Sequence, residues 1–294
     1  MISRAAAATT TPVALADLWA LTKPRITLMV LVTTAGGMWL AGHPSAVRVA
    51  LTLVGTALVV AGANTLNMYL ERDIDGRMRR TRDRPLPAGR LRPSIALGMG
   101  LGFGVVSVPV LLAGANALTA ALGLFSLVVY VWVYTPMKQR SPMALLVGAV
   151  PGAMPPLMGW TSATGALQWP GLVLFAMLWL WQVPHFLAIT LFRTDDYAGA
   201  GFEILAAQRG ARTARIHAAI YLAALLAASL LLSPAGAGRG PYLAIAATLG
   251  GALLGWGLLG LRRDVGARWA RGLFAGTLLY LIGLFAAIAA TSRH

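Results

Sequence analysis

A long apolar segment runs directly into a dense cluster of charges within residues 47–85, VRVALTLVGTALVVAGANTLNMYLERDIDGRMRRTRDRP. Residues 47–68 are apolar and long enough to cross a bilayer. The next residues, 71–85, hold four of the nine acidic side chains of the chain, a charge density that a lipid-facing helix does not tolerate. The stretch therefore predicts a membrane-spanning helix that ends in a polar rim at one face of the membrane.

The rest of the chain shares this apolar character. Hydrophobic residues make up 58% of its 294 residues and charged residues only 11%, whereas an ordinary globular domain has about 25% charged residues. We expect an all-α, multi-pass membrane protein with one membrane-embedded domain over residues 1–294, of which residues 1–18 form a flexible tail. Nine segments near the ~20 residues that span a bilayer are predicted at 26–42, 47–68, 93–114, 117–134, 143–162, 168–191, 214–233, 241–261 and 270–290.

The net charge of +15 follows from membrane topology. If the N-terminus lies in the cytoplasm, all of the 24 basic residues except Arg48, Arg239 and Arg293 fall on the inner side. This distribution predicts an N-in, C-out protein of the cell (inner) membrane and excludes nucleic acid as a partner. With no cysteine, the chain has no disulfide and no thiolate metal ligand.

Oxygen-bearing side chains recur at every fourth position where the second span ends, at Asn67, Glu71 and Asp75. If the helix continues through them, they lie on one face, and Asp73 points away from it. Magnesium prefers such hard oxygen ligands and completes its shell with water and substrate phosphates. We therefore predict that this face binds Mg²⁺ and is catalytic.

Basic residues near this face could bind a polyphosphate, because guanidinium and ammonium groups donate to phosphate oxygens. A solvated loop whose acids pair with its own arginines is the alternative. The functional interpretation is favoured because Asn67 lies within an apolar segment, where polar groups are costly. The candidates for substrate binding are Arg72, Arg80, Arg82 and Arg84 on this loop, with Lys138 on another inner loop.

A second acidic cluster, Arg193-Thr-Asp195-Asp196-Tyr197, follows the sixth span. Taken alone it is a weak signal, because Asp196 could equally cap a helix or pair with Arg193. Just upstream, His185 follows Pro184 near the inner end of the span. This histidine is a candidate ligand, acid–base group or packing residue.

Together these segments resemble the haem O synthase (protohaem IX farnesyltransferase) branch of the UbiA-type intramembrane prenyltransferases. The resemblance covers residues 18–290 and departs after Tyr197, where two expected prolines are absent, so the shape of that loop stays open. The matching segments, in order, are Leu21–Arg25, Asn67–Asp75 with Arg80, Arg82 and Arg84-Pro85, Tyr134-Thr135 with Lys138, Pro155–Trp160, Trp181–Phe186 and Asp196-Tyr197.

The resemblance implies transfer of a farnesyl group from farnesyl diphosphate to a vinyl group of haem b, with hydroxyl addition from water, to make haem O. It implies about nine helices around a central chamber, a site on the cytoplasmic side, Mg²⁺ as cofactor, haem b as substrate, and haem A synthase or a terminal oxidase as partner. It assigns the second metal-binding carboxylate to Asp196 rather than Asp195. It also adds substrate contacts at Asp73, His185, Arg193 and Tyr197.

Three alternatives are weighed against this interpretation. A UbiA-type prenyltransferase that acts on a quinone precursor is the closest. Asp75-Gly76 is similar to the opening of a CDP-alcohol phosphotransferase motif, but the later acidic pair of that motif is missing after Gly89. A membrane transporter is less favoured, because its charged residues are expected in mid-span.

Overall fold

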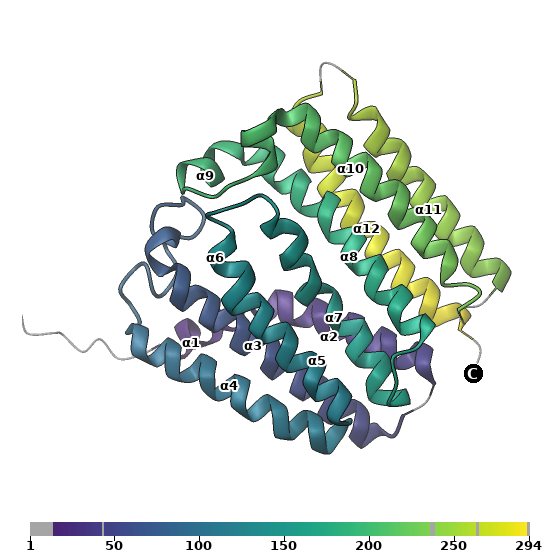
Figure 1. Cartoon of the computed structure of the whole chain (residues 1–294), viewed down its shortest axis with the longest axis horizontal. Coiled ribbons are helices and arrows are strands. Elements are labelled where there is room, and N and C mark those ends of the chain that lie inside the picture. The colour runs from purple at the N-terminus through teal and green to yellow at the C-terminus, as the bar shows by residue number, and fades with distance from the viewer. Residues whose placement is uncertain (1–13, 43, 236–238, 263–264, 293–294) are drawn as a thin grey trace, which may run out of the picture.

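The computed structural model describes residues 14–42, 44–235, 239–262 and 265–292, and every regular element within them is helical (Figure 1). Eight helical segments are long and apolar enough to cross a membrane. A ninth helix, α7, has 21 residues but is not among these eight, so the observed count is close to the nine spans predicted. The segments are α2 (Pro24–Ala41), α3 (Ala46–Asp75), α4 (Pro93–Gly114), the continuous run α5 (Ala117–Val128), η1 (Val129–Tyr134) and α6 (Thr135–Met137), α7 (Ala144–Thr164), α8 (Trp169–Phe192), α10 (Leu205–Leu231), α11 (Arg239–Leu259) and α12 (Ala267–Thr291).

Two short helices lie outside the spans, α1 (Leu15–Leu21) and α9 (Thr194–Gly199). The expected N-terminal tail is therefore too long by several residues, because residues 15–18 already belong to α1. Helix α1 is held by a 3.1 Å ion pair between Arg90 Nη2 and Asp17 Oδ1 and by the fully buried Leu21. Residues 1–13 of the expected tail lie outside the described residues.

The long helices form two packed groups that α2 and α7 join (Figure 1). Helices α3, α4 and α5 pack around Val59, Leu111 and Leu127 on one side. Helices α8, α10, α11 and α12 enclose the larger core, around Leu174, Leu222 and Leu284. Because α7 contacts α2, α5 and α8, it ties the two groups into one body.

Helix α7 packs so closely on α2 that their backbones touch. A Cβ atom added at Gly159 would lie 2.0 Å from the carbonyl oxygen of Thr34, and one added at Gly37 would lie 2.1 Å from that of Pro156. Small residues permit such approach between membrane helices, where packing replaces the hydrophobic effect as the driving force. Glycine is therefore required at both positions of this helix pair.

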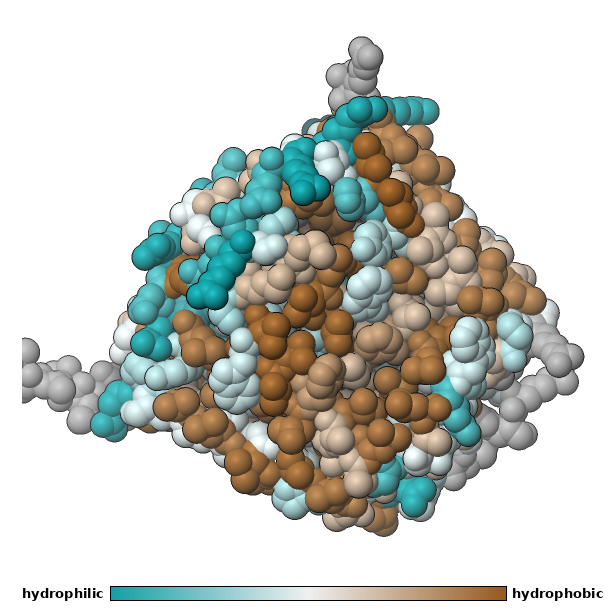
Figure 2. Space-filling view, in the orientation of Figure 1, coloured by the Kyte–Doolittle hydropathy of each residue, from teal (hydrophilic) through white to brown (hydrophobic). Residues whose placement is uncertain are grey.

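Hydrophilic residues gather at one edge of the molecule, over α9 and the loop that follows α3, while the middle of the visible face is largely hydrophobic (Figure 2). Helix α1 lies at this edge, and α12 ends at the opposite side of the bundle (Figure 1). The polar edge therefore brings together the two acidic loops that the sequence singles out.

We expect Gly159→Ala to destabilise the protein by about 1–3 kcal/mol, the usual cost of overpacking a tight contact. The measurement is thermal unfolding of the purified protein in detergent. Gly255→Ala is the matched control, since a Cβ there meets nothing within 4 Å. Equal melting temperatures for the two variants would contradict direct backbone contact between α2 and α7.

Candidate active site

The last turns of α3 carry the predicted oxygen face. Asn67, Glu71 and Asp75 are 2%, 4% and 2% exposed, and the helix runs unbroken through all three. The carboxamide of Asn67 donates from Nδ2 to Glu71 Oε2 at 2.9 Å. Asp73 points away as expected, with its side chain 81% exposed. The structure thus confirms that three oxygen-bearing side chains share one buried helix face.

Each of these three side chains contacts its own cation, and each cation comes from a different segment. Lys138 Nζ, after α6, lies 2.5 Å from Glu71 Oε1. Arg84 Nη1, in the loop after α3, lies 2.6 Å from Asp75 Oδ2. A third contact, 3.3 Å long, runs from Lys23 Nζ to the amide oxygen of Asn67. Since an unpaired buried charge is costly, these contacts let the acidic face remain buried.

Lys23 also belongs to the site, although the sequence analysis did not predict it as a site residue. It caps the N-terminus of α2 and is the only non-glycine residue with positive φ, at 48°, among those described. Backbone strain of this kind persists where surrounding contacts impose it. Burial, with added repulsion from Arg84 and Lys138, lowers the pKa of the Lys23 ammonium to about 7. The sequence signal that points to Lys23 is the segment Leu21–Arg25, which resembles the family.

The fourth span orients the amide of Asn67. Its C-terminal part contains a π-helical turn, η1, an irregularity that is frequent at functional sites. The hydroxyl of Thr135 donates to the Tyr130 carbonyl at 2.8 Å and accepts from Asn67 Nδ2 at 3.1 Å. Because both hydrogen bonds that Asn67 donates use Nδ2, its carbonyl oxygen faces Lys23, as a cation ligand must.

The loop after α3 folds back on the helix that precedes it. The Thr81 hydroxyl donates to the backbone carbonyl of Asp75 at 2.7 Å, and Arg84 returns to the Asp75 carboxylate. Arg84, which the sequence analysis predicted as a substrate-binding residue, therefore lies at the acidic face. Arg72 instead donates to the Tyr69 carbonyl at 2.8 Å, and Arg82 lies 3.9 Å from Asp83 with both side chains exposed.

The two acidic loops meet, as the resemblance implies. Asp196 Oδ1 accepts from the backbone N–H of Arg79 at 3.3 Å, and Arg80 Nη2 donates to the Tyr197 hydroxyl at 3.0 Å. Asp195 is exposed by comparison. Arg193 is also exposed, its guanidinium 5.7 Å from the Phe192 ring.

The loop that lacks the expected prolines is shaped by apolar packing instead. Phe202 and Ile204 join the buried Met78 in a small cluster between the loops. The backbone N–H of Glu203 donates to the Lys138 carbonyl at 3.0 Å, which fastens this segment to the end of the fourth span. The segment thereby holds Lys138 near the acidic face, since the Phe202 ring centroid lies 5.5 Å from its ammonium group.

The donor set fits a magnesium ion that is completed by substrate. Glu71 and Asp75 supply two carboxylates and Asn67 an amide oxygen, and Mg²⁺ usually takes one or two carboxylates with water and phosphate oxygens. Among the described residues, no three acidic or histidine side chains meet at one point. Asp196 therefore does not join Glu71 and Asp75 in a ready-made carboxylate cage, and its role as a metal ligand stays a prediction.

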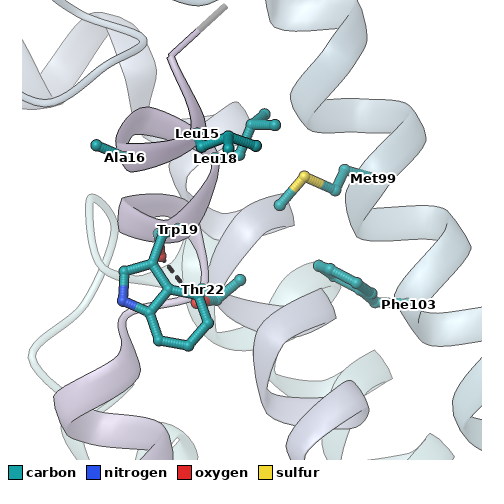
Figure 3. Close-up of a pocket in the computed structure, with 7 residues that line it drawn as sticks. All are labelled: Leu15, Ala16, Leu18, Trp19, Thr22, Met99 and Phe103. Carbon is teal, nitrogen blue, oxygen red and sulfur yellow. Dashed lines mark hydrogen bonds between the residues drawn. The ribbon is translucent and has the colours of Figure 1, made fainter.

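An apolar groove of about 620 Å³ lies apart from this face, between α1 and α4 (Figure 3). Leu15, Leu18, Trp19, Met99 and Phe103 are among its lining residues, and none of the residues that line it is charged. Leu15 and Trp19 are 83% and 65% exposed, as expected for a helix lying in the membrane interface. The groove therefore lacks the groups that a diphosphate requires.

Comparison with known proteins decides the family. Residues 30–290 match the UbiA prenyltransferase family. The chain belongs to this family. It is 55% identical over 273 residues to a protein named protoheme IX farnesyltransferase from Anaeromyxobacter sp. (strain Fw109-5), with 92% of each chain covered. It is 51% identical over 282 residues to a protein of the same name from Myxococcus xanthus (strain DK1622), with 95% of each covered.

Solved structures of membrane proteins share the fold. A structure of digeranylgeranylglyceryl phosphate synthase superposes with a TM-score of 0.79 at 14% identity, over 94% of this chain and 98% of that one. A UbiA homolog from Archaeoglobus fulgidus, bound to GPP and Mg²⁺, gives 0.66 at 16% identity, over 93% and 99%. At such identities the likeness establishes the helical arrangement.

The contact between Asp196 and the first loop predicts different effects for two adjacent carboxylates. We expect Asp196→Ala to lower turnover by about 10–100-fold, the range for residues that support a metal or its ligands. Asp195→Ala, the matched control, should leave turnover within about twofold, because its exposed side chain has no ion-pair partner among the described residues. Steady-state kinetics with both variants checks this, and the reverse order would refute the assignment.

Proposed function

We propose that this protein transfers the farnesyl group of farnesyl diphosphate to a vinyl group of haem b, with addition of hydroxyl from water, and so makes haem O for terminal oxidases. The names of its relatives and the match of its motifs support this activity. The site lies at the cytoplasmic side of the cell membrane, where the basic residues concentrate. Haem A synthase or a terminal oxidase would receive the product.

The observation that carries the proposal is the buried face of Asn67, Glu71 and Asp75 with one cation on each member. Asn67, Glu71 and Asp75 would hold Mg²⁺, and Lys138 and Arg84 would then be free to donate to diphosphate oxygens. Bound Mg²⁺ would supply Lewis-acid stabilisation of the charge on the leaving group. A structure solved with GPP and Mg²⁺ in a UbiA homolog supports this pairing of ligands.

The reaction itself needs a charged rim beside an apolar interior. The bond between farnesyl C1 and the diphosphate oxygen breaks, its electrons leave with the diphosphate, and an allylic cation remains. The vinyl π electrons then form the new carbon–carbon bond, and water captures the resulting cation beside the porphyrin ring and loses a proton. Lys23, Lys138 and Arg84 stabilise the departing charge, while apolar helix faces keep water from the first cation.

Purified protein incubated with haem b, farnesyl diphosphate and Mg²⁺ should yield a haem that is heavier by one farnesyl group and one hydroxyl, as detected by mass spectrometry. Chelation of divalent cations should stop product formation. A parallel incubation with an aromatic quinone precursor in place of haem b tests the other acceptor class. Prenylation of that precursor, with haem b unchanged in its own reaction, would contradict the proposal.

Asp75→Asn should lower kcat by about 100-fold or more, the order expected when a group that stabilises transition-state charge is lost. The amide keeps the size of the side chain, so the variant should still fold and elute as the wild-type protein does. Asp83→Asn is the matched control, because Asp83 lies on the same loop with its side chain 86% exposed. Wild-type turnover by Asp75→Asn would contradict the metal-binding face.

A further inference from the structure

The imidazole of His185 is held in one position between α8 and α12. Its ring stacks on Trp181, with centroids 4.6 Å apart and an interplanar angle of 22°, and lies 4.7 Å from the Phe274 ring. Phe186 meets it edge-on at 5.6 Å. The residue is only 9% exposed. Three aromatic rings thus pack against the imidazole, whose polar atoms are its two ring nitrogens.

One hydrogen bond selects the tautomer of this ring. His185 Nδ1 lies 2.9 Å from the hydroxyl oxygen of Thr277, and that hydroxyl lies 2.7 Å from the Phe274 carbonyl. A carbonyl oxygen can only accept, so the single hydroxyl proton of Thr277 is used in this shorter contact. This arrangement favours donation from His185 Nδ1–H to the Thr277 oxygen. In that tautomer the lone pair of the neutral ring lies on Nε2.

A second hydrogen bond holds the backbone of Thr277 against α8. The indole Nε1 of Trp181 donates to the Thr277 backbone carbonyl at 2.7 Å. Trp181 therefore both stacks on His185 and fixes the residue that hydrogen-bonds to it. Thr277 lies 92 residues from His185 in the sequence, so this hydrogen bond joins two helices that are far apart along the chain.

The Nε2 atom has no hydrogen-bond partner among the described residues, but it is not sealed into the protein. Among the described residues, His185 Nε2 is not one of the fully enclosed side-chain atoms that lack a hydrogen bond. Nε2 consequently retains accessible surface. A buried aromatic cage thus presents one lone pair to an incoming group.

We propose that Thr277 is a positioning residue that holds His185 as the Nδ1–H tautomer, so that Nε2 binds the iron of the haem acceptor as an axial ligand. This inference rests on the proposed function and deepens it. Metal-ligating histidines typically donate their other ring N–H to an oxygen, which is the arrangement seen here. A haem propionate would require a donor at Nε2, and the tautomer places a lone pair there.

The depth of His185 suits an apolar porphyrin. It lies seven residues before the inner end of α8 at Phe192, or about 10 Å along the helix axis. The charged rim at Glu71 and Asp75 is formed by the inner end of α3. A porphyrin held through iron at His185 would lie among apolar helix faces, while the diphosphate remains at the charged rim.

The test is titration of ferric haem b into purified protein in nanodiscs, read by the Soret band and by electron paramagnetic resonance. Wild-type protein should give the spectrum of histidine-ligated haem, and His185→Ala should lose it. Added imidazole should restore it in His185→Ala, which a packing role would not produce. His217→Ala is the control, because His217 Nδ1 contacts the Thr213 carbonyl within α10, and its spectrum should match wild type.

Variants at Thr277 separate positioning from bulk. Thr277→Val keeps the shape but removes the acceptor, so haem affinity should fall by about 10–100-fold, as for other groups that orient a metal ligand. Thr277→Ser should retain wild-type affinity and spectrum. Diphosphate affinity should be unchanged in every variant, which shows that each is folded.

Three outcomes would overturn different claims. If wild-type protein binds haem with a spectrum that His185→Ala leaves unchanged, the ligand assignment is wrong and the proposed function stands. If wild-type protein binds diphosphate but no haem, haem as the acceptor is wrong, and the ligand assignment fails with it. A Thr277→Val variant that equals Thr277→Ser in affinity and spectrum would overturn the positioning role alone.

Discussion

The burial of two carboxylates and a carboxamide at the end of α3 is the constraint on which the site depends. Such groups remain buried only when each is paired, because desolvation of an isolated charge costs several kcal/mol or more. Their partners Lys23, Arg84 and Lys138 come from the start of α2, the loop after α3 and the end of the fourth span. Pairing therefore fixes three separate segments at one point of the polar edge.

In the function that we propose, the same pairing prepares the site for an anionic substrate. Cations already assembled around the oxygen face need little rearrangement to donate to a diphosphate, and preorganisation of this kind lowers the cost of stabilising charge during reaction. The second loop contributes through packing: Phe202 and Ile204 anchor it, and Glu203 ties it to the backbone of Lys138. Two prolines that the family pattern predicts are thus replaced by an apolar cluster.

Close helix packing connects this charged rim to the apolar interior. Because glycines let α7 touch α2 through the backbone, the group containing α3 and the group containing α8 and α12 form one body. His185 belongs to the second group and the acidic face to the first. In the proposed function, the packing of these two groups therefore places a charged site for diphosphate and an apolar site for a porphyrin in one molecule.

By itself, the sequence determined the spans, the continuation of the second span through Asp75, the outward direction of Asp73 and the family. These features depend on hydropathy, helical periodicity and motif spacing, which are local properties of the chain. Only the tertiary structure decided which residues meet. Lys23 contacts Asn67 across 44 residues, Thr135 contacts it across 68, and Thr277 contacts His185 across 92. The tertiary structure also shows that Arg84 reaches the acidic face, whereas Arg72, Arg82 and Arg193 do not. Side-chain pairing depends on how the helices pack and how the loops fold back, and a local sequence pattern does not specify either.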